Sequence, residues 1–196
     1  MQDLETERLI LRPFTEADVD EIYRLVYADA RVREAWSGYT GSLSEFRERF
    51  ATDPVWHAED GFGFLAVVRQ DGNQLLGLIG FQRYEPGEDI GYMVFEDPAD
   101  RVGITPVIVE VELTYALGYA YWGYGYATEA ARALIGYGFG ELGIDRIVNA
   151  VIVHPKHRSL ALMKRLGFRI IKNLKRDYIT QGPFAGSPGA IGILEK

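Results

Sequence analysis

The chain is 196 residues long, enough for one domain with a substantial hydrophobic core, and 47% of its residues are apolar. No stretch approaches the ~20 consecutive apolar residues of a membrane span, so a soluble protein without a membrane partner is expected. The absence of cysteine excludes a disulfide scaffold, a thiolate metal site and a cysteine nucleophile, and the three scattered histidines lack metal-ligand spacing, so no metal is expected.

The charge of the chain is unevenly distributed around a net value of −7. Residues 146–176 contain nine Lys or Arg and no Asp or Glu, which leaves 12 basic and 28 acidic residues elsewhere. The acidic remainder disfavours general nucleic-acid binding. The basic segment would serve a phosphate-rich ligand, bind nucleic acid, or form a solvated face, the commonest fate of such runs. The N-terminus has no apolar signal-peptide core, and a cytoplasmic location is expected.

The N-terminal region predicts a strand followed by a helix. Leu9 and Leu11 alternate with Ile10 and Arg12, and this pattern suggests a strand over Arg8–Pro13. Thr15 is a typical N-cap with acidic residues after it. Apolar residues then repeat at helical spacing, at Val19, Ile22, Tyr23, Val26 and Tyr27.

The later elements are predicted from the same periodicities. In chain order they are a helix from Ser42 or Ser44 to Phe50 that ends at Thr52-Asp53-Pro54, strands over Gly63–Arg69 and Leu75–Arg83, a short strand over Ile90–Phe95, a strand over Val107–Leu117, a helix from Ala127, a strand over Arg146–Val153, a helix over Arg158–Leu166, a strand over Phe168–Ile171 and a last strand within Asp177–Lys196. Asp71-Gly72 is a strong hairpin signal, residues 84–106 form a loop insertion in this prediction, and Gly167 is expected to end its helix.

Glycines mark the helix that begins at Ala127, both before it and inside it. Gly123 and Gly125 lie between the preceding strand and the helix, where they permit positive φ and a close approach of a ligand to the backbone. Such a loop directs several N–H groups, and the positive end of the helix dipole, toward one point, which suits an anion such as a pyrophosphate. The alternative is a simple tight turn. The helix itself contains glycines that predict either close packing against a sheet or an early helix end: Gly136, Gly138 and Gly140.

Three segments resemble one protein superfamily. Trp122–Ala130 resembles the acyl-CoA pyrophosphate loop of the GNAT N-acetyltransferases, and most closely the branch of ribosomal-protein N-terminal acetyltransferases. Only Tyr124 departs, where that branch usually has a polar or basic residue. Leu4–Pro13 resembles the first strand of this branch, and residues 158–168 resemble its last helix and the start of the next strand. The resemblance spans residues 4–174, nearly the whole chain.

The fold that this resemblance implies is α/β (α+β) and GNAT-like. It has a mixed, mostly antiparallel sheet of about six to seven strands, flanked by about four helices, with a splayed central strand pair. Residues 1–196 would form a single domain. The helices before residue 54 would flank the acceptor side, so aromatic residues there would either line a substrate site or, as the favoured interpretation, form ordinary core. They are Trp36, Tyr39, Phe46, Trp56, Phe62 and Phe64.

The reaction that the resemblance implies is transfer of an acetyl group from acetyl-CoA to a primary amine. An N–H donor must stabilise the thioester oxygen, and the leaving thiolate needs a proton. The expected cofactor contacts are Leu117, Gly118 and Tyr119 near the thioester, Trp122, Gly123, Tyr124, Gly125, Tyr126, Ala127 and Thr128 in the pyrophosphate loop, and Lys156, Arg158 and Ser159 at the start of the last helix.

Two glutamates in the strand before the loop are the candidates for the general base. Glu110 and Glu112 alternate with apolar residues, so the pleat puts both on one face of the strand. By resemblance, Glu112 matches an acidic residue proposed as the base, although Thr114 stands where the family has Gly. Repulsion between the two carboxylates would favour a proton on one of them. The alternative is that this face is solvated or pairs with arginines.

Ser159 is the candidate proton donor to the thiolate, because it matches the family serine at the start of the last helix. Its alternative role is to cap that helix. Lys156 replaces the family asparagine, and no tyrosine occurs in residues 158–166, where many GNAT enzymes have their acid. His154 and His157 are possible substitutes.

Three functions follow from these patterns. The favoured function is acetylation of a peptide N-terminus or a small-molecule amine. The second is a non-catalytic acyl-CoA-binding module of the same fold. The third is a nucleic-acid or ribosome-binding protein that uses residues 146–176, which the acidic remainder disfavours. Either a monomer or a homodimer is compatible with the sequence.

Overall fold

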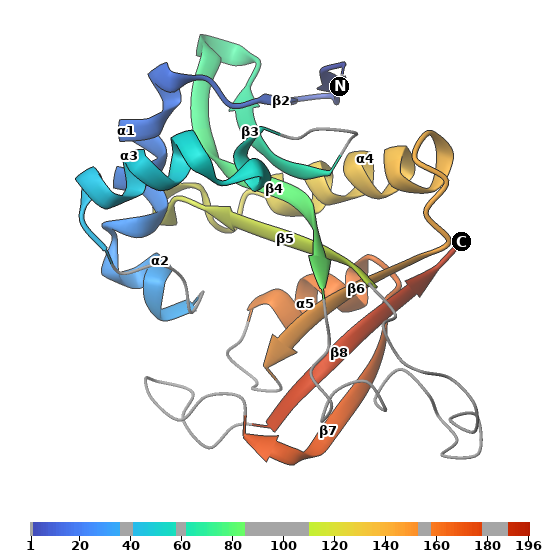
Figure 1. Cartoon of the computed structure of the whole chain (residues 1–196). Coiled ribbons are helices and arrows are strands. Elements are labelled where there is room, and N and C mark those ends of the chain that lie inside the picture. The colour runs from blue at the N-terminus through green and yellow to red at the C-terminus, as the bar shows by residue number, and fades with distance from the viewer. Residues whose placement is uncertain (1, 36–40, 58–61, 85–109, 153–157, 178–187) are drawn as a thin grey trace. The chain divides into compact units, whose positions relative to one another are not determined.

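The computed structural model describes residues 2–35, 41–57, 62–84, 110–152, 158–177 and 188–196 (Figure 1). The chain divides into two compact units, residues 1–82 with 113–143 and residues 83–112 with 144–196. Strand β5 (Glu110–Leu117) begins in the second unit and ends in the first. The single domain over residues 1–196 stays a prediction.

The strands form one sheet in which neighbours hydrogen-bond in the order β1-β2-β3-β4-β5-β6-β8-β7. They are β1 (Leu4–Glu5), β2 (Leu9–Pro13), β3 (Gly63–Arg69), β4 (Gln74–Tyr84), β5, β6 (Arg146–Ile152), β7 (Arg169–Asp177) and β8 (Pro188–Glu195). Pairs β1–β2, β2–β3, β3–β4, β6–β8 and β7–β8 are antiparallel, and β5–β6 is parallel.

This sheet confirms the predicted mixed, mostly antiparallel architecture. Within the described residues the sheet has eight strands, where six to seven were expected. One of them, β1, is only two residues long, too short for a hydrophobic period to reveal. The predicted strand over 90–95 lies outside the described residues, and the splay of the central strand pair stays a prediction.

Among its described residues, the first unit has three helices that the sequence predicts and one that it does not. The predicted helices are α1 (Val19–Ile22), α3 (Leu43–Thr52) and α4 (Tyr126–Gly140), and the other is α2 (Ala30–Ala35). Thr15 is the N-cap of a 3-10 turn that leads into α1, and its N–H donates to Asp18 Oδ2 at 2.8 Å. Ser42 caps α3 in a reciprocal pair with Glu45. Both predicted helix starts are therefore confirmed.

The helix that follows Thr15 is not continuous. Residues Tyr23–Tyr27 form a π-helical turn, in which Ala28 N–H donates to Tyr23 C=O at 2.8 Å. Leu25, Val26 and Tyr27 are all buried there. Three consecutive inward residues do not fit one face of a regular α-helix, and the wider turn accommodates them.

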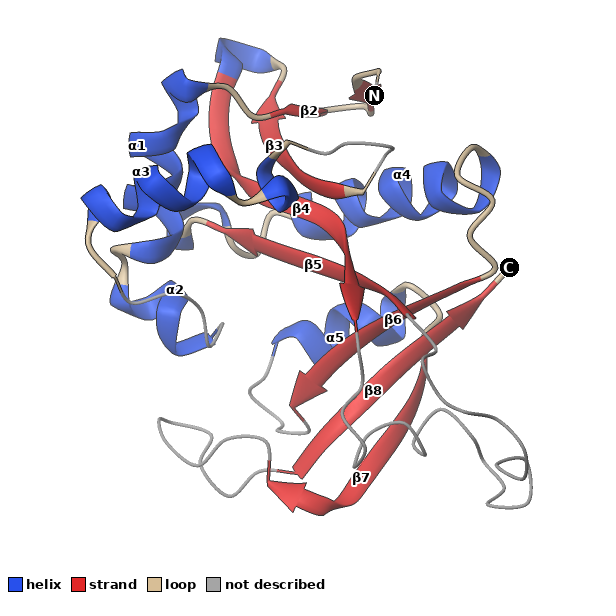
Figure 2. Ribbon diagram, in the orientation of Figure 1, coloured by secondary structure: helices blue, strands red, loops and turns tan. Residues whose placement is uncertain are grey.

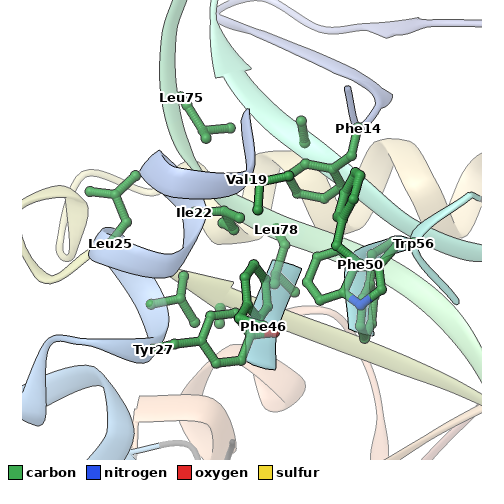
Figure 3. Close-up of a cluster of buried hydrophobic side chains, with 14 of the residues drawn as sticks. Phe14, Val19, Ile22, Leu25, Tyr27, Phe46, Phe50, Trp56, Leu75 and Leu78 are labelled. Carbon is green, nitrogen blue, oxygen red and sulfur yellow. The ribbon is translucent and has the colours of Figure 1, made fainter. Parts of the chain in front are cut away.

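The core of the first unit is rich in aromatic rings (Figure 3). The indole of Trp56 contacts Phe14, Phe46 and Phe64 edge to face, with ring centroids 5.3, 5.2 and 5.1 Å away. The interpretation as core is therefore confirmed for Phe46, Trp56 and Phe64. Phe62 is half-buried beside Phe81, and positions 36 and 39 lie outside the described residues.

Strand β3 is buried on both of its faces. Its residues Phe64, Ala66 and Val68 belong to the aromatic core, whereas Leu65 and Val67 alternate onto the other face. Leu11 of β2 pairs with Val67 in register. Helix α4 crosses this second face, opposite α1 and α3 (Figure 2).

Two glycines of β4 allow its neighbours to approach closely. A Cβ added to Gly77 would lie 2.2 Å from the Ala116 carbonyl oxygen of β5. A Cβ added to Gly80 would lie 2.1 Å from the Gly63 carbonyl oxygen of β3. Any side chain at either position would have to displace backbone.

The second unit has β6 between the start of β5 and β8. Val111 and Glu112 pair in parallel with Ile147 and Val148, and β6 pairs along its whole length with β8. Helix α5 (Arg158–Arg165) ends near Gly167, whose φ of +88° confirms its predicted role as the helix stop.

No helix in the described ranges is long and apolar enough to cross a membrane.

Helix α4 continues through its glycines, so the predicted early helix end is wrong. A Cβ added to Gly136 or Gly140 would meet nothing within 4 Å, and both residues are exposed, so close packing does not explain these two glycines either. Only Gly138 is buried.

We expect Gly136→Ala to stabilise the protein by about 0.5–1 kcal/mol, because alanine loses less backbone entropy in a helix and has free space here. Urea unfolding measures the change. Gly77→Ala is the contrasting variant, and it should be strongly destabilising because of the contact with Ala116. A neutral or destabilising Gly136→Ala would contradict this account of α4.

Candidate active site

The glycine loop connects the end of β5 to the start of α4. After Leu117 the chain makes a 3-10 turn at Tyr119–Tyr121, passes through residues 122–125 and enters α4 at Tyr126, one residue earlier than predicted. The predicted order of strand, glycine loop and helix is confirmed.

Both loop glycines have left-handed backbone conformations. The φ angle is +90° at Gly123 and +85° at Gly125, as the sequence predicted. Gly125 is the N-cap of α4, and its carbonyl oxygen accepts from the N–H groups of Thr128 and Glu129, both at 3.0 Å. No side chain caps this helix start. Its first amides and the helix dipole are suited to an anion such as a pyrophosphate.

Hydrogen bonds to the main chain fix where the loop begins. Trp122 Nε1–H donates to the Leu117 carbonyl oxygen at 2.7 Å. The Gly118 N–H donates to the Leu76 carbonyl oxygen of β4 at 2.8 Å. Two of the backbone groups that the resemblance places near a thioester therefore have partners within the protein. An oxyanion donor at this strand end would have to come from another amide.

An ion pair joins the bend between β1 and β2 to the first turn of α4, and the same arginine contacts the loop. Arg8 donates from Nε to Glu129 Oε2 at 2.7 Å and from Nη1 to the Tyr124 carbonyl oxygen at 3.1 Å. Glu129 Oε1 accepts from Thr6 Oγ1 at 2.6 Å and from the Arg8 N–H at 2.9 Å. The Arg8 guanidinium also lies 4.6 Å from the centroid of the Tyr126 ring.

Sequence reasoning assigned no role to Thr6, Arg8 or Glu129. Thr6 and Arg8 lie in the first segment that resembles the family, Leu4–Pro13. Glu129 lies in another, Trp122–Ala130. The joint presence of these segments was the available signal, but residues 121 positions apart cannot be paired from a single sequence.

Tyrosines give the loop an exposed aromatic surface. Tyr124 is 64% exposed and stacks on Tyr126 with ring centroids 5.9 Å apart. Tyr119 contacts Trp122 at 5.1 Å and lies under the Arg31 guanidinium at 4.0 Å. At position 124 the chain therefore presents a ring where the resembling branch presents a polar or cationic group.

Comparison with known families identifies this arrangement. The profile described as the acetyltransferase (GNAT) domain matches residues 8–169. The chain belongs to the GNAT acetyltransferase family. The matched range includes Arg8, the glycine loop, α4 and α5.

Known GNAT proteins are similar over nearly the whole chain. The uncharacterized N-acetyltransferase YoaA of Bacillus subtilis (strain 168) is 26% identical over 182 residues, which cover 91% of this chain and 88% of YoaA. A GNAT-family acetyltransferase from Bacillus anthracis has a TM-score of 0.71 at 20% identity, covering 99% of this chain and 98% of that one. RimL, a ribosomal L7/L12 alpha-N-protein acetyltransferase solved with coenzyme A, has a TM-score of 0.68 at 17% identity, covering 99% and 98%.

The candidate base of this GNAT chain lies in the second unit. Glu112 is 9% exposed and pairs in register with Val148 of β6. Thr114, which follows in the first unit, is also buried, so this part of the strand face is not solvated. Glu110 lies on β5 two residues before Glu112, and its side chain is outside the described residues.

The candidate acid and phosphate ligands belong to α5. The helix begins at Arg158, which is exposed, so Ser159 is its second residue rather than its N-cap. Ser159 is half-buried. Positions 154, 156 and 157 lie outside the described residues. The structure thus brings together residues 117–128 within the first unit, and it holds Glu112, Arg158 and Ser159 in the second.

The ion pair of Arg8 and Glu129 has an electrostatic signature. Partial burial acts to raise the pKa of the Glu129 carboxyl, but hydrogen bonds from Thr6 and Arg8 outweigh it and lower the pKa below its ordinary value. A lowered folded-state pKa contributes stability above the unfolded-state pKa, and this contribution disappears as the pH falls through the folded-state value.

We therefore expect Glu129→Gln to reduce the acid sensitivity of folding. The difference in unfolding free energy between wild type and variant should be largest at neutral pH and shrink below about pH 4.3, the pKa of an unperturbed Glu. Urea unfolding at a series of pH values measures it. A difference that does not change with pH would show that the carboxylate charge contributes nothing.

Proposed function

We propose that this chain transfers the acetyl group of acetyl-CoA to a primary amine, either a peptide N-terminus or a small-molecule amine. The supporting observation is the glycine loop, with two left-handed glycines before the uncapped start of α4. Membership of the GNAT family supports the same chemistry. The coenzyme A bound to RimL, a protein of this fold, supports acetyl-CoA as the co-substrate.

The proposed contacts for acetyl-CoA are those that the family resemblance implies. The amides at positions 123–127 are the proposed ligands of the pyrophosphate, because they lead into a helix with no side-chain cap. Thr128, also proposed at this site, already uses its N–H to bond the Gly125 carbonyl oxygen. Arg158 is the leading proposed cation for the remaining phosphate, with Lys156 close to it in the sequence, and Tyr124 offers an exposed ring rather than a cation. When bound, acetyl-CoA supplies the activated acetyl group as a thioester.

Three proton-handling roles fall to residues of this chain. Glu112 is the proposed base that takes a proton from the acceptor ammonium, directly or through water, with Glu110 as its neighbour on β5. Ser159 is the proposed donor of a proton to the thiolate. Because the Gly118 N–H already bonds Leu76, the N–H of Leu117 or Tyr119 is the proposed oxyanion donor.

A non-catalytic acyl-CoA-binding module is the second candidate. It is favoured by two departures from the family pattern: Lys156 replaces the family asparagine, and residues 158–166 contain no tyrosine. Tight CoA binding without thioester consumption, over a panel of peptides and small amines, would select it.

We expect Gly125→Val to lose most of the affinity for CoA while the protein stays folded. A β-branched residue at φ +85° is strained by about 1–3 kcal/mol, and relief of the strain would move the amides of the helix start. Isothermal titration calorimetry measures CoA binding. Gly143→Val is the matched control, because its φ of +66° carries a similar strain about 22 Å away, beyond the far end of α4. Equal CoA affinity in both variants would exclude the loop as the binding site.

We expect Glu112→Gln to lower turnover by roughly 10²–10⁴-fold if Glu112 is the direct base, because glutamine keeps its size but cannot accept the proton. CoA affinity should change little, and the loss should shrink at high pH, where more of the amine is neutral. The measurement is a pH–rate profile of wild type, Glu112→Gln and Glu110→Gln with an accepted amine. Full activity of Glu112→Gln at pH 7 would remove Glu112 from the mechanism and leave the cofactor assignment intact.

A further inference from the structure

Arg8 makes two different contacts with one guanidinium. Its Nε and Nη2 face Glu129 Oε2, at 2.7 and 2.6 Å, while its Nη1 donates to the carbonyl oxygen of Tyr124 at 3.1 Å. A planar fork with several fixed donors can hold a carboxylate and a carbonyl together, whereas the single ammonium of lysine acts as a point charge. The contact with Tyr124 is therefore specific to arginine.

The contact with Tyr124 determines how one peptide group of the loop is oriented. The peptide bonds of the described residues are trans, so the Gly125 N–H is directed opposite to the Tyr124 carbonyl. With the carbonyl held at Arg8, the amide is directed away from Arg8. If the peptide plane were reversed, the Tyr124 carbonyl oxygen would point where the Gly125 N–H now points. It would repel a phosphate there.

This peptide group needs an external constraint. It joins Tyr124 to Gly125, so a rotation of its plane changes ψ of Tyr124 and φ of Gly125. Gly125 has a φ of +85°, and glycine opposes a change of φ less than other residues do. Around position 125 there is also free space, since the nearest atom to an added Cβ is Arg8 Nη2 at 3.5 Å. Among the described residues, the hydrogen bond from Arg8 Nη1 to the Tyr124 carbonyl oxygen holds this peptide group in its orientation.

The position of Arg8 is itself fixed by α4. Glu129 lies in the first turn of the helix and accepts from Thr6 Oγ1, from the Arg8 N–H and from the Arg8 side chain. Both the backbone and the guanidinium of residue 8 are thereby attached to the helix whose N-terminus the loop forms. The cation also compensates the carboxylate charge close to the proposed anion site.

We propose that Arg8 is a positioning residue for the cofactor, which holds the Tyr124–Gly125 peptide with its amide available to the pyrophosphate of acetyl-CoA. Glu129 and Thr6 hold Arg8 in place for this purpose. The inference rests on the proposed function, because it requires that the loop binds the pyrophosphate.

The test is Arg8→Lys, which keeps the charge near Glu129 and loses the second contact. We expect the Kd for CoA and the KM for acetyl-CoA to rise about tenfold, because one charge-assisted hydrogen bond is lost. The kcat should stay within about twofold of wild type, because Arg8 does not take part in the chemical step. S-Acetylpantetheine lacks the pyrophosphate, so its kcat/KM should not change. Arg47→Lys is the matched control, because Arg47 also makes an exposed bidentate ion pair, with Asp20, far along the chain from the loop. It should change none of these constants.

A second variant separates positioning from general stabilisation. Glu129→Gln removes the charge but keeps a side-chain oxygen that can still accept from Arg8, so Arg8 stays beside Tyr124. CoA affinity should therefore fall less than in Arg8→Lys, even where Glu129→Gln lowers Tm more. Equal losses for the two variants, or an unchanged Kd in Arg8→Lys, would overturn the positioning role. If wild type itself does not bind CoA, the proposed function fails. If wild type binds CoA and Arg8→Lys binds equally well, only the positioning role fails.

Discussion

The hydrogen bond from the Gly118 N–H to the Leu76 carbonyl oxygen attaches the end of β5 to β4, and the loop that follows starts from this point. The contact requires two backbones to approach closely, and Gly77 permits it because a Cβ there would lie 2.2 Å from Ala116 O. The Trp122 indole then returns to Leu117 and closes the turn. The glycine loop is thus positioned by backbone contacts at one end and by Arg8 at the other.

Much of the fold could be predicted from local patterns. The caps Thr15 and Ser42, the hairpin at Asp71-Gly72 and the helix stop at Gly167 are encoded within a few residues, and the structure has all of them. The π-helical turn and the two-residue β1 were missed, because neither changes a hydrophobic period enough to be seen. The glycines of α4 left two interpretations open, close packing or an early helix end. Gly138 is buried and the helix runs on to Gly140, since propensity is a weak signal beside packing.

The candidate site could be predicted only in part. Positive φ at Gly123 and Gly125 followed from residue type, because few other residues adopt it. The partners of the loop did not follow, because Arg8 and Glu129 meet across 121 positions and the use of the Gly118 amide depends on β4. The proposed role of Ser159 came from resemblance alone, and that of Glu112 came from resemblance together with the strand pleat. The chemistry of both depends on an acceptor that a sequence pattern does not encode.

The contact of α4 with the bend between β1 and β2 also limits how this loop can be transferred to other proteins. A segment cut from β5 to the end of α4 is contiguous and would look like a self-sufficient module for a protein engineer. It would carry the Tyr124 carbonyl and the Glu129 carboxylate but leave Thr6 and Arg8 behind. A graft would therefore have to bring a piece of the N-terminal strand with it, and shortening the chain from its N-terminus past residue 8 would alter the loop without removing any of its own residues.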